Sequence, residues 1–237
     1  MAIHLYRINS NFAQMFHFLV YMLLLTTCYL LPDACSAQNK KNDWRMHKNE
    51  NGIAIYERIS AGSEYREIKS VLTLKTSLNS IVALIYDWDS YPQWNYKCGE
   101  SKTLKKISET ELIHYQTTIV PWPAQHQDLV INIKLSQDEK TRTVTIKSTN
   151  NPTYIPPIAD RTRVEEFYGI WTLTPKKDGT VGVAYQFRVK PGGYIPIWLV
   201  NMAALFGPYE TMYNFKQWIV KDKYQKAKST FIKELTD

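Results

Sequence analysis

The chain has 237 residues, enough for one sizeable domain or two very small ones. Hydrophobic residues make up 44% and charged residues 22%, an ordinary balance for a globular protein, and 16 Tyr and 7 Trp favour a substantial core. The formal net charge of +7 favours anionic partners such as membrane headgroups. No arginine-rich tract or nucleic-acid motif accompanies this charge, so nucleic-acid binding is not expected.

The first 37 residues have the three-part pattern of a secretory signal peptide. Arg7 lies in a segment without acids, residues 15–31 form a continuous apolar run, and small residues at Cys35 and Ala37 precede the expected cleavage site. We therefore expect an exported protein, periplasmic or secreted. The alternative is an uncleaved N-terminal membrane anchor, because the apolar run is near the lower length limit for crossing a bilayer. Cleavage leaves Cys98 as the single cysteine, so no intramolecular disulfide is expected.

Residues 38–237 are predicted to form one domain that begins with a helix and two strands. Residues 44–50 fit one or two helical turns that stop at Asn51-Gly52. Two strands are then predicted over residues 52–59 and 65–75. Helical spacing follows over residues 76–94, where Thr76 or Ser77 caps the helix and Pro92 ends it.

Six strands and a long helix complete the predicted order. The strands cover residues 99–110, 111–120, 128–138, 141–150, 163–176 and 180–190, and the last two are joined by a hairpin turn at residues 176–179. From Pro196 a helix is predicted to run to residue 235, kinked or interrupted at Gly207-Pro208. Its first half is apolar nearly all round, which predicts burial on more than one side. Consecutive hairpins with segregated helices indicate an α+β fold with an antiparallel sheet that curls.

The ordered segments resemble the START family of lipid-transfer domains (steroidogenic acute regulatory protein-related), within the helix-grip superfamily. The resemblance runs from Trp44 to about Ile219, through "GIAIYERI", "LIYDWDSYPQW", "ESKTLKKI", "PWPAQHQDLV", "RTRVEEFYGIWTLTP" and "GGYIPIWLVN". It implies a curved antiparallel sheet wrapped around a long C-terminal helix, with an internal hydrophobic cavity for one lipid. The helix and neighbouring loops then act as a lid, with Gly192-Gly193 and Gly207-Pro208 as hinges.

One position departs from the family pattern. Members commonly have Arg-Asp where this chain has Gln127-Asp128, and in some that Arg pairs with a cavity Glu that corresponds here to Glu100. A buried carboxylate without a partner tends to take up a proton. Gln127 could then hydrogen-bond a protonated Glu100; alternatively Arg163 or His114 partners Glu100, or Glu100 faces solvent. The sequence therefore does not identify the polar group of the ligand that this chain would recognise.

Candidate ligand-binding residues come from this loop, the strands and the long helix. They are Glu100, His114, Trp122, Gln127, Arg163, Leu199, Met202, Phe206, Tyr209 and Tyr213. The last five are spaced near one helical stripe, where core packing is the alternative. Trp122, held between Pro121 and Pro123, either packs under the lid, touches a membrane interface, or packs against a neighbouring loop.

No catalytic machinery is recognisable in the sequence. The chain has no G-x-S-x-G elbow, P-loop or dinucleotide fingerprint, and the histidines lack metal-ligand spacing, so we expect no catalytic residue, metal or cofactor. The first hypothesis is an exported monomeric lipid-binding protein that touches membranes transiently. The second is a helix-grip enzyme, a cyclase or hydrolase, with Glu100, His114, Arg163 and Tyr115 around one pocket. The third is a partner-binding domain whose cavity is filled by side chains.

Overall fold

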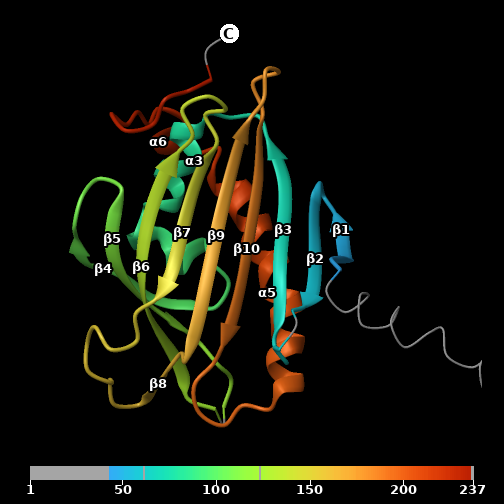
Figure 1. Cartoon of the computed structure of the whole chain (residues 1–237), viewed down its shortest axis with the longest axis vertical. Helices are drawn as coiled ribbons and strands as arrows, with labels where there is room; N and C mark the ends of the chain where they lie inside the picture. The colour runs from blue at the N-terminus through green and yellow to red at the C-terminus, as the bar shows by residue number, and fades with distance from the viewer. Residues whose placement is uncertain (1–42, 61, 123, 236–237) are drawn as a thin grey trace, which may run out of the picture. The chain divides into compact units, whose positions relative to one another are not determined.

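A computed structural model describes residues 43–60, 62–122 and 124–235, and the predicted signal segment 1–37 lies outside these residues. Trp44–Asp237 form one compact unit by their internal contacts. Within it, nine strands form one continuous sheet in the order β1-β2-β3-β10-β9-β7-β6-β5-β4, and a tenth, β8, pairs with β6 (Figure 1). The strands are β1 (Arg45–Glu50), β2 (Ile53–Ile59), β3 (Arg66–Leu74), β4 (Cys98–Lys106), β5 (Glu111–Thr118), β6 (His126–Gln137), β7 (Val144–Asn150), β8 (Arg161–Arg163), β9 (Glu166–Pro175) and β10 (Val181–Lys190).

All neighbours in this sheet are antiparallel except β8, which runs parallel to β6. The two-residue alternation along each strand sends side chains to an inner face, which packs against the long helix, and to an outer face. Inner-face residues form the main core; on β6 they are Leu129, Ile131, Ile133 and Leu135. A smaller outer-face cluster contains Ile113, Tyr115 and Val130. The predicted α+β class with its antiparallel sheet is confirmed.

The segment predicted as helical turns at the start of the domain is a strand instead. β1 pairs with β2 along the edge of the sheet, with a register shift between Met46 and Lys48. Asn51 and Gly52 both have positive φ, 53° and 74°. An Asn-Gly pair of this kind makes a two-residue hairpin turn that matches strand twist. The Asn51-Gly52 dipeptide is therefore the turn of a hairpin and not the stop of a helix.

The predicted helix over residues 76–94 is divided into three short pieces. They are α3 (Leu78–Ile85), the 3-10 turn η1 (Trp88–Ser90) and α4 (Tyr91–Trp94). Ser77 caps α3 as predicted, since its side chain accepts a hydrogen bond from the Ser80 backbone N–H. Pro92 does not end the helical segment, because it lies in the first turn of α4, where its missing N–H costs little.

The long C-terminal helix α5 (Ile197–Trp218) is shorter than predicted. It begins after Pro196 and continues through Gly207-Pro208 without interruption, and it packs against β2 and β3 (Figure 1). A four-residue helix, α6 (Asp222–Gln225), follows, and residues 227–235 are not helical. The single helix predicted to run to residue 235 therefore ends at Trp218, and among the described residues beyond it only α6 is helical.

Hydrogen bonds to the body of the domain explain why this tail is not helical. The Glu234 carboxylate accepts from the backbone N–H groups of Leu78 and Asn79, at 3.0 and 2.9 Å, at the beginning of α3. Gln137 pairs with the Lys233 backbone in both directions, at 2.7 and 2.9 Å. Tertiary partners thus replace the hydrogen bonds of a helix. Within the described residues, no helix is long and apolar enough to cross a membrane.

Candidate functional site

The inner face of the sheet and the second half of α5 form a tightly packed aromatic core. Trp171 stacks on Tyr185 with ring centres 4.3 Å apart, and Phe215 of α5 lies 5.5 Å from Trp171. Met212 and Phe215 are fully buried, and Tyr209 is nearly so. Tyr209 also accepts a 2.8 Å hydrogen bond from Asn51 and carries Lys48 above its ring. This half of the helix is thereby fixed to the sheet.

The first half of α5 is much more open than its sequence predicts. We expected burial on more than one side, but Trp198, Met202 and Phe206 are exposed and Leu199 is only partly buried. Ala204 and Leu205 face the core. The five predicted helix residues therefore do not share one buried stripe: Tyr209 is buried, Leu199 is intermediate, and Met202, Phe206 and Tyr213 point toward solvent.

The Asn201 side chain joins this open half of α5 to the β2–β3 hairpin by two hydrogen bonds. Its Oδ1 accepts a 2.9 Å hydrogen bond from the Arg66 backbone N–H, and its Nδ2 donates a 3.0 Å hydrogen bond to the Glu64 carbonyl oxygen. Sequence reasoning missed Asn201, because one polar residue on an apolar helix gives no local sign of its partner.

Gln127 does not meet Glu100 but holds the connection between β10 and α5. Its side chain is 6% exposed, and its Oε1 accepts a 3.0 Å hydrogen bond from the Gly192 backbone N–H. A Cβ on Gly192 would overlap the Arg163 carbonyl oxygen, so this position requires glycine. At the position where the family resemblance implies an arginine, this chain has a neutral amide, which binds the backbone at the expected hinge.

Glu100 is paired on the outer side of the sheet. Arg161 and Lys102 donate hydrogen bonds to its carboxylate at 2.9 and 2.7 Å, and Arg161 also donates to the Tyr115 hydroxyl at 2.5 Å. Hydrogen bonds from Lys102 and Arg161 lower the pKa of Glu100, and its side chain is 40% exposed. The expectation that Glu100 takes up a proton is therefore wrong. Sequence reasoning missed Arg161, although it lies two residues before Arg163 on the same strand face.

Arg163 also lies on the outer face, where it anchors a loop. Its guanidinium forms two parallel hydrogen bonds with the Asp128 carboxylate, at 2.9 and 3.0 Å. It also donates to backbone carbonyl oxygens of the proline-rich loop over residues 151–160, which are those of Pro152, Ile155 and Pro156. This arrangement fixes the loop between β7 and β8 (Figure 1).

His114 lies on the inner face of β5, opposite Ile131 of β6. It is fully buried beneath Trp88, with ring centres 4.3 Å apart, and its Nε2 lies 3.4 Å from the Ser101 hydroxyl. Its Nδ1 is buried without a hydrogen-bond partner. Burial lowers the pKa of His114 to about 3, so the ring is neutral near pH 7. The cluster that the enzyme hypothesis requires is not formed, because Glu100, Tyr115 and Arg163 lie on the opposite face.

Trp122 stands out into solvent. It is 91% exposed, so neither packing under the lid nor packing against a neighbouring loop holds. Its loop ends where β6 begins, and there the His126 ring accepts a 3.2 Å hydrogen bond from the Val120 backbone N–H. Contact with a membrane stays a prediction.

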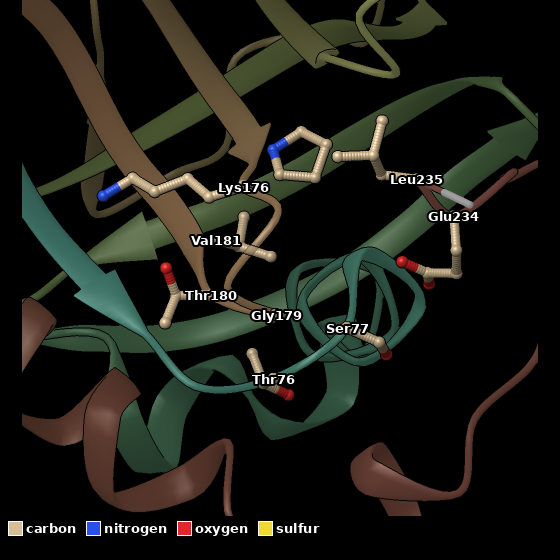
Figure 2. A pocket seen from close by; sticks show the side chains of 9 residues that line it. Thr76, Ser77, Lys176, Gly179, Thr180, Val181, Glu234 and Leu235 are labelled. Carbon is tan, nitrogen blue, oxygen red and sulfur yellow. The ribbon is translucent and has the colours of Figure 1, made fainter. Parts of the chain in front are cut away.

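A pocket of about 250 Å³ lies away from all of these residues, beside the beginning of α3 (Figure 2). It is lined by Thr76, Ser77, Pro175, Lys176, Gly179, Thr180, Val181, Glu234 and Leu235. Glu234 is already engaged by the α3 backbone, as described above. In the described part of the chain, no three His, Cys, Asp or Glu side chains gather as a metal site requires.

Comparison with known proteins identifies the family of this fold. The START domain profile matches residues 33–206. The chain belongs to the START domain family. An uncharacterized protein of Pseudomonas aeruginosa is 34% identical over 172 residues, which are 72% of this chain and 83% of that protein. The phosphatidylcholine transfer protein of Mus musculus is 26% identical over 171 residues, covering 70% of this chain and 78% of that protein.

Solved START structures agree with this assignment. The crystal structure of a STAR-related lipid transfer protein from Xanthomonas axonopodis superposes with a TM-score of 0.70 at 30% identity, covering 75% of this chain and 99% of that one. The helix-grip arrangement predicted from the ordered segments is confirmed.

Proposed function

We propose that this protein binds a lipid between the inner face of its sheet and α5 and carries it between membranes. The observation that carries the proposal is the START fold together with an inner face that is apolar or aromatic along most of its strands. Relatives named as lipid transfer proteins support the same reading. Moving a lipid's chains from water onto such a surface is favourable by about 25 cal/mol per Å² of apolar area. The proposal assigns a carrier rather than an enzyme, and one lipid per monomer.

The exposed side of the lid supports transient contact with a membrane. Trp198, Met202 and Phe206, spaced four residues apart on α5, are 68%, 45% and 62% exposed. Tyr194, just before the helix, is 100% exposed, and Trp122 lies in a loop that adjoins the Gln127–Gly192 contact. Aromatic side chains favour the membrane interface, and a basic protein favours anionic headgroups. We therefore expect the lid to open while its apolar side contacts the bilayer.

Lipid bound to the purified protein is the direct test. Native mass spectrometry of protein purified from its host, followed by lipid extraction, should show one lipid per chain, and labelled lipid should move between vesicles when the protein is added. Trp198→Ala combined with Phe206→Ala should slow transfer while leaving the melting temperature unchanged. Ile107→Ala, an equally apolar exposed residue in the β4–β5 turn, is the matched control. Absence of bound lipid and of transfer for every lipid class would contradict the proposal.

We further propose that the chain is exported and acts outside the cytoplasm. The three-part pattern of residues 1–37 supports this, with a retained N-terminal anchor as the alternative. Cell fractionation with sequencing of the mature N-terminus separates the two. A new N-terminus near residue 38 supports cleavage, and an intact N-terminus in the membrane fraction supports the anchor.

A further inference from the structure

Arg66 and Glu57 form an ion pair on the inner face of the sheet. In the β2–β3 register Glu57 lies opposite Ile68, a core residue, so Arg66 is its diagonal neighbour on the same face. The Arg66 Nη1 bonds the Glu57 Oε2, and the two side chains are 26% and 15% exposed. The pair is therefore largely withdrawn from water.

The open half of α5 lies over this ion pair. Asn201 of α5 binds the backbone of Arg66 itself and the carbonyl oxygen of Glu64, two residues earlier. A ligand that enters beneath this half of the helix thus passes beside the Arg66 side chain. Detachment of Asn201 would open the same end of the sheet to solvent.

Arg66 is the single charged residue among the inner-face positions of β3, β5, β6, β7, β9 and β10, all of which are described. The other positions on these strands are apolar, aromatic, glycine, proline or neutral polar, and the one histidine, His114, is neutral near pH 7. Across most of the sheet, a ligand meets one guanidinium and otherwise uncharged surface. The inner face therefore has one charged end and an otherwise uncharged remainder, and this arrangement matches the polar end and the apolar chains of an amphiphilic ligand.

The Arg66 side chain keeps a donor for such a ligand. Its Nε is buried and has no hydrogen-bond partner. A buried donor without an acceptor is unfavourable, and an incoming oxygen would satisfy it. Guanidinium groups bind carboxylate and phosphate through paired N–H donors, and Glu57 occupies only one terminal nitrogen in the bond described above.

We propose that Arg66, oriented by Glu57, binds an anionic oxygen at the polar end of the ligand, a phosphodiester or a carboxylate. The acyl chains then lie along the apolar inner face toward Tyr185 and Trp171. This inference rests on the proposed lipid binding, and it names the ligand class: phospholipid or fatty acid rather than an uncharged lipid.

Binding of three labelled lipids with the same acyl chain tests the proposal: a phosphatidylcholine, a fatty acid and a diacylglycerol. Arg66→Gln should weaken binding of at least one of the first two about tenfold or more, as expected for loss of a charge-assisted hydrogen bond. Binding of diacylglycerol, which lacks the anionic oxygen, should stay within about twofold, because its burial is unchanged. Glu57→Gln, which removes the ion pair of Arg66, should strengthen binding of the same lipid, and weaker binding would count against a free Arg66 as the binding group.

The controls separate recognition from folding. Arg188→Gln removes an arginine of similar exposure, 28%, from the outer face of β10 and should leave all three affinities unchanged. Arg66→Lys should recover part of the lost affinity, and melting temperatures verify that each variant folds. Selective loss for phosphatidylcholine identifies a phosphodiester, and selective loss for the fatty acid identifies a carboxylate. The assignment of Arg66 is overturned if Arg66→Gln lowers the affinity for all three lipids equally or for none of them. It is also overturned if the wild-type protein binds only diacylglycerol. Wild-type protein that binds none of them refutes the proposed function itself.

Discussion

Replacement of Asn201 by alanine should release the first half of α5 while leaving the second half in place. Asn201 makes the two hydrogen bonds that join this half to the β2–β3 hairpin, at 2.9 and 3.0 Å. Residues 197–206 bury less apolar surface than the second half of α5, because Trp198, Met202 and Phe206 face outward. The second half keeps Tyr209, Met212 and Phe215 in the core.

The magnitude follows from the two lost hydrogen bonds. Each contributes about 0.5–1.5 kcal/mol net, so together they stabilise the closed helix by about 1–3 kcal/mol. That difference corresponds to an increase of about 5- to 150-fold in the fraction of open molecules. A detached helical segment of this length is marginal in water, so its backbone amides should then exchange with solvent.

Hydrogen exchange measured by mass spectrometry provides the assay. Peptides from residues 197–206 should lose protection in the Asn201→Ala variant, whereas peptides from residues 209–218 should not. Lipid transfer between vesicles should become faster if lid opening limits it. Asn214→Ala is the control, since it removes one hydrogen bond to the Trp94 carbonyl oxygen from the buried half of the same helix. Unchanged protection of residues 197–206, or equal loss along all of α5, would refute the reasoning.

Three further substitutions test other parts of the structure. Gly192→Ala should lower the melting temperature and weaken the Gln127 contact, because the added Cβ overlaps the Arg163 carbonyl oxygen; a wild-type melting curve would contradict this. Burial lowers the pKa of His114 from 6.5 to about 3, so the unfolded chain binds more protons between these values and stability should fall as pH decreases through that window. In the His114→Leu variant, the free energy of unfolding measured in urea should depend less on pH within that window. An unchanged pH dependence would contradict the assignment to His114. Glu234→Ala should destabilise the protein by about 1 kcal/mol, the usual effect of losing a helix cap; unchanged chemical denaturation would show that the tail contact contributes nothing.

Most strands of the sheet could be predicted because their signal is local. On β6, alternation alone places Leu129, Ile131, Ile133 and Leu135 on one face, and the structure buries all four. The hairpin between β9 and β10 and the Ser77 cap also depend on neighbouring residues. β1 could not be predicted in this way, because its polar sequence is held as a strand by pairing with β2.

The prediction that the first half of α5 is buried on more than one side was wrong for a physical reason. A helix that is apolar nearly all round is ordinarily buried, yet here one side packs on the sheet and Trp198, Met202 and Phe206 remain exposed. Sequence alone cannot separate a core helix from one whose outer side meets a membrane, since both require the same residues.

The sequence by itself determined the order of most elements after residue 52, the faces of the long strands and the family of the fold, because periodicity, turn chemistry and ordered motifs act over short stretches of chain. Only the tertiary structure decided which polar groups meet. It joins Glu100 to Arg161, Arg163 to Asp128 and Gln127 to Gly192. These partners lie 35 to 65 residues apart in the chain. Their meeting depends on strand register and on the path of the loop over residues 151–160, which no single segment encodes. The same dependence places Arg66 beneath α5, where it is the one arginine among the inner-face positions of β3, β5, β6, β7, β9 and β10.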